Sequence, residues 1–291
     1  MSISTLVSIK GAPASSRPRR GAPDHEPAGS RRSHARIRSH ALRAMPVWLR
    51  HALFIAALTG VWELAAGQGL LDPAFFGRPS GIAAYLWKGF VTDGALWREL
   101  GYTLAGAVIA FVGGSVCAVA TGLLFMVFPG FHRASEPYLT LLNAMPRIAL
   151  APLFLLWFGL GLGSKVAVGF SLTFFIVLSA TVAGIRSVNS DHLVLSKALG
   201  ATPRQVFTKV TLPSAVPVIF SGFRLGLIFA LLGVVGAELI AAEHGLGQTL
   251  AYLQSTFSMD GVMGLLFLLA FLGLGVTSLM NRLERALLDW Q

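Results

Sequence analysis

Long runs of residues without a charged side chain constrain this chain more than any other feature. Asp, Glu, Lys and Arg are absent from five of them: residues 100–132, 148–164, 166–185, 225–237 and 261–281. A membrane-spanning helix needs about 20 mostly apolar residues, so several runs are long enough to cross a bilayer alone. They lack the apolar–polar alternation of barrel strands, and backbone groups in lipid must be paired within the segment. The sequence therefore predicts an all-α integral membrane protein.

Six transmembrane helices are expected. Their approximate bounds are 52–71, 102–128, 137–160, 163–184, 215–240 and 261–283. Lys and Arg favour cytoplasmic segments, and 17 of them fall in segments on the side of the N-terminus against four on the opposite side. This asymmetry predicts a multi-pass protein with both termini in the cytoplasm, and it makes residues 72–99 an extracytoplasmic loop.

The basic N-terminal segment carries most of the net charge. Residues 1–50 hold ten basic and two acidic residues, which gives +8 of the +10 of the whole 291-residue chain. Rich in Arg, Pro, Ser, Gly and Ala, this segment cannot bury a core. We expect a disordered cytoplasmic tail near anionic lipid rather than a nucleic-acid-binding arm. No apolar stretch follows the early arginines until about residue 52, which argues against a cleavable signal, and Met45 leaves open whether residues 1–44 are translated.

Three regions follow from this organisation. We expect a tail over residues 1–46, a first transmembrane helix with its extracytoplasmic loop over 47–94, and a permease-like transmembrane domain over 95–291. The single cysteine, Cys117, lies inside an apolar run, so it forms no internal disulfide and is expected to act as a small packing residue.

A polar stretch, "ALGATPRQVFTKVTLPSAVP" at residues 198–217, interrupts the apolar chain between the fourth and fifth spans. Ser190 is expected to cap a helix that begins at Asp191 and ends before Gly200. Thr202 is expected to cap a second helix with Pro203 in its first position. That helix is expected to have an apolar face of Val206, Phe207 and Val210 and a polar face of Arg204, Gln205, Thr208 and Lys209. The turn into the fifth span is expected at Pro213 and Pro217. From physics alone, a plain connecting loop is an equal alternative.

This stretch resembles the cytoplasmic EAA-loop signature of binding-protein-dependent ABC transporter permeases. The signature is Glu-Ala-Ala, three residues, Gly, nine residues and Ile-x-Leu-Pro. Gly200 matches its glycine, and Val210-Thr211-Leu212-Pro213 matches its end. The Glu-Ala-Ala triplet falls on Val194, Leu195 and Ser196, so the acidic residue is absent. Residues 61–81, 143–165 and 221–250 also resemble the nitrate/sulfonate/taurine/bicarbonate-type subfamily of type I importers, and the likeness covers about residues 50–291.

The resemblance implies a function. It implies the permease subunit of an ATP-driven importer for a small solute, an organic or inorganic anion of the sulfonate, taurine or nitrate type. It implies a coupling helix, at about residues 191–199, that transmits closure of a cytoplasmic ATPase to the spans. The ATPase-coupling residues carried over are Asp191, Leu195, Ser196, Lys197, Gly200, Ala201, Leu212 and Pro213.

The resemblance also implies partners and a location. The partners are a cytoplasmic ABC ATPase, an extracytoplasmic substrate-binding protein and a second permease copy in a homodimer, in a bacterial inner membrane. This chain has no phosphate-binding loop of the G-x-x-x-x-G-K-[ST] type, so ATP and Mg are expected on the partner ATPase, with no cofactor in this chain. No metal-ligand cluster or paired carboxylates suggest an enzyme. The alternative is a stand-alone secondary transporter or channel, although that class usually has more spans with internal repeats.

Ionisable residues within spans are costly and therefore candidates for function. Arg147 and Glu238 are expected to line the solute pathway or a gate, and an arginine there suits an anionic substrate. Arg224 is expected to extend to the interface or pair with a helix end. Glu63 is expected to have a packing or interface role.

Overall fold

The computed structural model describes residues 46–287, and every regular element in that range is helical. The expected tail over residues 1–46 lies outside the described residues except for Pro46. The chain divides within its first long helix into two units, residues 1–56 and residues 57–291. Of the first unit the structure describes only residues 46–56, which begin that helix.

Five long helices carry the architecture. Their bounds are Val47–Gly67 (α2), Ala95–Val127 (α5), Leu162–Arg186 (α8), Leu212–Ile240 (α11) and Met259–Leu287 (α13). The shorter helices are Pro73–Phe76 (α3), Pro79–Trp87 (α4), Pro129–Ala144 (α6), Ala151–Phe158 (α7), Ser190–Ala198 (α9), Pro203–Val206 (α10) and Leu246–Ser255 (α12). Two π-helical turns, Lys88–Thr92 (η1) and Phe207–Thr211 (η3), and one 3₁₀ turn, Arg147–Leu150 (η2), join them.

The number of helices that can cross a membrane agrees with the expected fold. Over residues 46–287, five helices are long and apolar enough, and a sixth span results if α6 and α7 together count as one. Large apolar side chains such as Leu156, Phe271 and Val116 are exposed on the helices. An apolar exterior of this kind is what lipid requires.

Helices α5, α8 and α11 pack closely because small residues line their contacts. Gly114 and Ala110 on α5 are buried, as are Gly222 and Gly226 on α11. A Cβ atom at Gly114 would lie 2.9 Å from the Thr173 side chain and 3.1 Å from the Phe170 carbonyl oxygen of α8. The pairs of small residues four positions apart, Ala110/Gly114 and Gly222/Gly226, therefore mark places where helix backbones approach each other, as such pairs do in membrane bundles.

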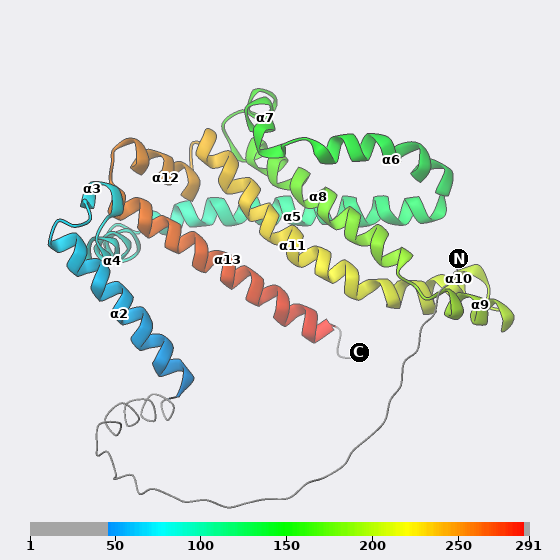
Figure 1. Cartoon of the computed structure of the whole chain (residues 1–291). Coiled ribbons are helices and arrows are strands. Elements are labelled where there is room, and N and C mark those ends of the chain that lie inside the picture. Colours follow the sequence, from blue (N-terminus) through cyan, green and yellow to red (C-terminus); the bar gives the residue numbers. More distant parts are fainter. Residues whose placement is uncertain (1–45, 288–291) are drawn as a thin grey trace, which may run out of the picture. The chain divides into compact units, whose positions relative to one another are not determined.

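The two ends of this bundle differ. In Figure 1, α9 and α10 lie at one end, whereas α4 and α12 lie at the other. We call these the α9 end and the α12 end. Helix α11 runs from the first to the second, and α5 runs in the opposite direction, since α5 packs against α12 near the start of α5.

The third expected span, over residues 137–160, is a bent pair of helices rather than one continuous helix. The helix begins earlier, at Pro129, and α6 meets the η2–α7 segment at a bend of 84°. The break follows from Pro146, because proline disfavours helical backbone in the residue before it. Met145 accordingly has an extended conformation, with ψ of 136°.

The expectation of a turn at Pro213 and Pro217 is wrong. The helix that begins at Pro203 continues to Ile240 as a single span-length segment of 38 residues. The π-helical turn η3 lies directly before Pro213, and the Leu212 amide donates to the Phe207 carbonyl across it. A proline ring collides with the carbonyl four residues earlier in a regular helix, and the wider π turn relieves this collision.

The expected extracytoplasmic loop over residues 72–99 is largely helical. It contains α3, α4 and η1, and α5 begins at Ala95 rather than at about residue 102. Pro79 occupies the first turn of α4, where its missing amide hydrogen costs nothing. The Glu63 carboxylate of α2 accepts hydrogen bonds from the Ser80 amide (3.0 Å) and hydroxyl (2.8 Å), which fits a carboxylate beside a helix N-terminus.

Two adjacent glycines on α5 provide a test of the close packing. We expect Gly114→Ala to destabilise the protein by about 1–3 kcal/mol, because the added Cβ meets a backbone carbonyl of α8 that cannot rotate away. A Cβ at Gly113 meets only Phe170 ring atoms at 3.5 Å or more, so Gly113→Ala is the matched control. Thermal unfolding of both variants in detergent measures the difference, and equal midpoints would contradict the packing described here.

Candidate functional site

Helix α9 is the element of the predicted coupling region that leaves the bundle. It buries none of its residues, and Val194, Leu195 and Leu199 are 66%, 59% and 78% exposed. Its cap is one residue earlier than expected, because the Asn189 side chain, not Ser190, accepts from the Asp191 amide at 2.8 Å. Exposed large apolar side chains on a capped, polar-flanked helix are typical of a surface that a partner covers.

The turn after α9 is closed by two reinforcing motifs. The Gly200 amide donates to the Lys197 carbonyl (2.9 Å) and the Ala201 amide to the Ser196 carbonyl (3.0 Å). Gly200 has a φ of +75°, so this is a Schellman motif with glycine in the left-handed position. Thr202 and Gln205 then form a reciprocal capping box with Pro203 in the first turn, as the sequence predicts for Thr202.

The structure brings together some of the predicted coupling residues and separates others. Six of them lie on α9 or in its turn: Asp191, Leu195, Ser196, Lys197, Gly200 and Ala201. Leu212 and Pro213 lie farther along, where η3 passes into α11. The predicted two faces of the second helix are also present, since Val206, Phe207 and Val210 are partly buried whereas Arg204, Gln205, Thr208 and Lys209 are exposed.

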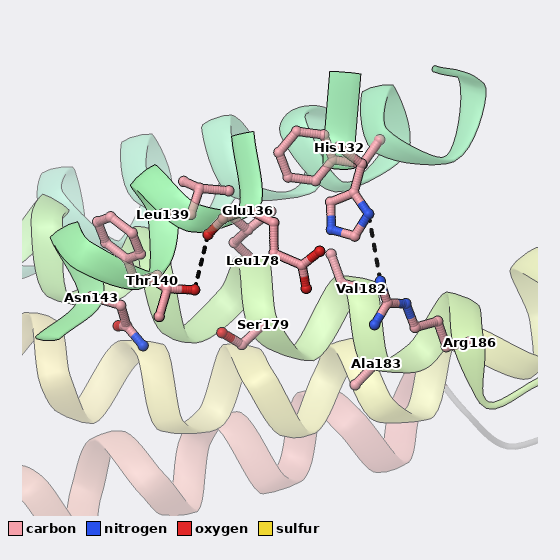
Figure 2. Close-up of a pocket in the computed structure, with 12 residues that line it drawn as sticks. His132, Glu136, Leu139, Thr140, Asn143, Leu178, Ser179, Val182, Ala183 and Arg186 are labelled. Atoms are coloured by element: carbon pink, nitrogen blue, oxygen red, sulfur yellow. Dashed lines mark hydrogen bonds between the residues drawn. The ribbon is translucent and has the colours of Figure 1, made fainter. Parts of the chain in front are cut away.

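A cavity of about 410 Å³ lies between α6 and α8, toward the α9 end. Figure 2 shows His132, Glu136, Thr140 and Asn143 on one wall, with Ser179 and Arg186 opposite. The Arg186 Nη2 atom lies 3.5 Å from His132 Nδ1. The sequence analysis did not single out these residues, although the spacing of polar residues along α6 was a usable signal.

Arg147, a predicted pathway residue, lies beyond this cavity at the bend between α6 and α7. Its Nη2 atom donates to Asn143 Oδ1 at 2.5 Å and to the Asn143 carbonyl at 3.2 Å. The guanidinium lies 4.3 Å from the centre of the Phe175 ring, in cation–π contact. Asn143 and Phe175 both line the cavity, so Arg147 is connected to its end nearest the bend.

Glu238, the other predicted pathway residue, is 1% exposed within the bundle at the α12 end. Its Oε1 atom is 2.9 Å from Lys165 Nζ, and its Oε2 atom accepts from Thr103 Oγ1 (2.9 Å) and the Gly247 amide (3.0 Å). A buried ion pair persists only when its remaining hydrogen-bonding groups are also satisfied. These contacts join α5, α8, α11 and the start of α12.

Lys165 is a buried charged residue that the sequence analysis did not single out. It is 3% exposed, and its ammonium also donates to the His244 carbonyl at 2.8 Å. Its position between two uncharged runs, 148–164 and 166–185, was a signal for a buried partner. Glu99 extends the same network, since its Oε2 atom accepts from the Gly245 amide at 2.7 Å.

The two remaining charged span residues are paired. Arg224 of α11, expected to extend to the interface or pair with a helix end, forms an ion pair with the Glu284 side chain in the last turn of α13. Glu63 binds the N-terminus of α4, in line with its expected packing or interface role. Within residues 46–287, no group of three or more His, Cys, Asp or Glu side chains has an arrangement that can hold a metal ion.

Comparison with known proteins assigns the chain to a class. The family described as binding-protein-dependent transport system inner membrane component matches residues 110–289, more than half of the chain. The formylaminopyrimidine transport permease protein ThiX of Halalkalibacterium halodurans is 32% identical over 246 residues, 84% of this chain and 96% of its own length. The chain therefore belongs to this family of multi-pass membrane proteins, the permease subunits of ABC importers.

Other relatives narrow the resemblance. The putative aliphatic sulfonates transport permease protein SsuC of Bacillus subtilis is 30% identical, with coverage of 84% of this chain and 88% of that protein. The taurine transport system permease protein TauC of Escherichia coli is 29% identical, with coverage of 81% and 87%. An inward-facing structure of the MetNI methionine ABC transporter has the same fold, with a TM-score of 0.58 at 21% identity over 66% of this chain and 95% of that one.

These findings confirm the predicted importer-permease family, its sulfonate/taurine-type resemblance and the all-α fold. They do not support the alternative of a stand-alone secondary transporter or channel. The relatives are permease subunits rather than enzymes, and in such importers ATP hydrolysis belongs to a separate subunit.

The buried Lys165–Glu238 pair generates a stability prediction. We expect Lys165→Met to destabilise the protein by about 3–5 kcal/mol, because the Glu238 carboxylate then stays buried without its cation. The double variant Lys165→Met/Glu238→Gln removes that unpaired charge and keeps an acceptor for Thr103 and Gly247, so we expect it to recover much of the loss. Chemical unfolding in mixed micelles gives both free energies.

The control is the exposed pair of Lys88 and Asp93, whose charged atoms are 4.0 Å apart with side chains 70% and 49% exposed. Lys88→Met is expected to change stability by less than about 1 kcal/mol. A double variant as unstable as Lys165→Met alone would show that loss of the ammonium donor to the His244 carbonyl, rather than an unpaired carboxylate, explains the effect.

Proposed function

We propose that α9 is the coupling helix of this importer permease, which docks on a separate ABC ATPase and transmits its closure to the spans. One observation supports this most directly. Helix α9 and its C-cap residue Leu199 expose three large apolar side chains, yet the helix is fixed at both ends by hydrogen-bonded caps. A helix that only connects two spans gains nothing from such exposure, whereas an ATPase groove would cover it.

The connection from α9 to the bundle is suited to transmit a rigid displacement. The Schellman turn leads into the capping box, and the helix that starts at Pro203 continues to Ile240. Helix α11 within it packs against α8 and α5 along the bundle. A displacement at α9 would therefore move α11 as one body, which is how helix shifts are propagated through packed bundles.

The departure at Val194 changes the chemistry proposed for docking. The family's acidic residue falls on Val194, which is exposed beside Leu195 on α9. We infer that this permease contacts its ATPase mainly through apolar packing at these two positions, with Asp191 and Lys197 at the two ends of the helix.

The orientation proposed follows the distribution of basic residues. Lys197, Arg204 and Lys209 lie in or next to the α9–α10 segment, and Arg186 ends α8 beside it. Basic residues favour the cytoplasmic face. We therefore place the α9 end and both termini in the cytoplasm of a bacterial inner membrane, and we place the α12 end toward the substrate-binding protein.

A second copy of the chain is the proposed partner within the membrane. Helix α6 buries none of its residues, and Tyr138, Leu141 and Leu142 are exposed on it. Lipid satisfies such a face in part, but a span that packs so little against its own chain is a natural place for a second permease. A homodimer supplies that neighbour, and lipid covers the remaining apolar surface.

The proposed cargo is a small anion of the sulfonate, taurine or nitrate type. The relatives named for aliphatic sulfonates and taurine support this class. Relatives named for formylaminopyrimidine and riboflavin show that neutral cargo also occurs at similar identity. Arg186 in the lining of the α6–α8 cavity and Arg147, bound to Asn143 at its end, favour the anion.

Assembly with the ATPase tests the docking role of α9. We expect Leu195→Arg to abolish co-purification of the ATPase subunit from gentle detergent, because a charge replaces an apolar contact in the groove. Tyr252 on α12 is 61% exposed and lies at the other end, so Tyr252→Arg is the matched control and should retain the ATPase. Full recovery of the ATPase with Leu195→Arg would contradict the proposal.

Gly200 tests the rigid connection separately from docking. A Cβ there meets no atom within 4 Å, so a substitution acts only through the backbone conformation at φ of +75°. We expect Gly200→Val to insert normally but to lose at least about 90% of the ATP hydrolysis stimulated by the binding protein, because β-branched residues avoid this conformation. Gly200→Asn, which tolerates it, should keep most of the stimulation. Equal activities would contradict a role for this turn.

A further inference from the structure

We propose that the cavity between α6 and α8 is a charge-selective segment of the solute path that favours small organic anions over cations. The inference rests on the proposed import function and adds to it the residues that select by charge. It starts from a regularity in α6. His132, Glu136, Thr140 and Asn143 recur at intervals of four, four and three residues, and Arg147 follows four residues later.

This spacing puts His132, Glu136, Thr140 and Asn143 on one face of α6. At 100° per residue they fall within about 80° of the helix circumference. Tyr138, Leu141 and Leu142 fall on the other side and are exposed. A polar stripe on a membrane helix is costly toward lipid, and such stripes face a bundle interior or a water-filled cavity. Figure 2 shows that this stripe does face the cavity.

The opposite wall of the cavity is formed by α8. It runs from Phe175 to Arg186, with Ser179 between them. Eleven residues of helix rise about 16 Å, which is roughly half of the hydrocarbon thickness of a bilayer. The volume of about 410 Å³ lies in the range of sites that hold a small organic molecule.

The charges of the cavity are unequal. Arg186 marks one end beside His132, and Arg147 is hydrogen-bonded to Asn143 at the other. Glu136 is the acidic residue of the lining. Over residues 46–287 neither arginine lies within 4.0 Å of a carboxylate oxygen, so neither guanidinium charge is neutralised by an ion pair. Arg186 in the lining balances Glu136, and Arg147, which lies just beyond the lining at the Asn143 end, adds a further positive charge. Arginines along a pore favour anions.

A cysteine at Ser179 makes the cavity testable with small charged reagents. The native Cys117 is exposed on the apolar surface of α5, so unmodified protein supplies the lipid-facing control, and Cys117→Ala supplies the background. Inside-out membrane vesicles that contain the assembled transporter are treated with an anionic sulfonatoethyl or a cationic trimethylammonioethyl methanethiosulfonate. Each rate of cysteine modification is divided by the rate at which the same reagent modifies a small thiol in solution.

We expect Ser179→Cys to react several-fold faster with the anionic reagent after this normalisation, whereas Cys117 reacts with neither. Adding Arg186→Gln should lower the anion-to-cation ratio about tenfold, the size expected when a unit charge is removed about 10 Å away in a partly aqueous protein environment. Adding Glu136→Gln should raise the ratio. Arg186→Lys keeps the charge and should keep the ratio, which separates the charge from the shape of the side chain.

Several outcomes would overturn the inference. Equal normalised rates would show a wet cavity without charge selection, and absence of reaction at Ser179→Cys would show that no aqueous path reaches it. An anion-to-cation ratio that stays the same in Arg186→Gln and Glu136→Gln would show that these two residues do not select the solute by charge. None of these outcomes alters co-purification of the ATPase, so failure here is distinguishable from failure of the proposed importer function.

Discussion

The ion pair between Lys165 and Glu238 holds the α12 end of the bundle together. Both side chains are almost fully buried, and the surrounding donors and acceptors are satisfied by Thr103, the Gly247 amide and the His244 carbonyl. The pair is therefore tied to three long helices and to the reversal between α11 and α12. Removal of one partner would leave an unpaired charge in a medium of low dielectric. The arrangement of the helices at this end is therefore stable only when both partners are present and in contact.

The rigid α12 end supports the coupling role proposed for the opposite end of the bundle. Helices α5, α8 and α11 meet through glycine and alanine contacts that leave no space for side-chain adjustment, as at Gly114 and Gly226. Such packing transmits displacement rather than absorbing it. Helix α6, in contrast, buries no residue of its own. The molecule thus combines a tightly packed three-helix unit with a loosely attached span, and the cavity lies where the two meet.

The fold class and the helix caps of the coupling region could be predicted from the sequence, because both depend on residues close together in the chain. Uncharged runs locate spans, and Thr202, Pro203 and Gly200 specify caps within a few residues of themselves. The predicted positions of the helix breaks were wrong where a proline can either end a helix or be accommodated within it. Pro146 breaks its helix, whereas Pro213 is accommodated by a π turn, and nothing in either proline decides between these results. Partners distant in sequence, such as Lys165 and Glu238, are found only in three dimensions.

Arg186 connects the cavity to the coupling region along the chain. It is the last residue of α8, and α9 begins four residues later at Ser190. A displacement of α9 would therefore reach the bundle at the end of α8 that carries this guanidinium as well as through α11. Lys165 and its buried pair lie at the opposite end of α8. The charge proposed to select the solute thus lies at the end of α8 nearest to the proposed ATPase contact, which places selection and coupling on neighbouring segments of the chain.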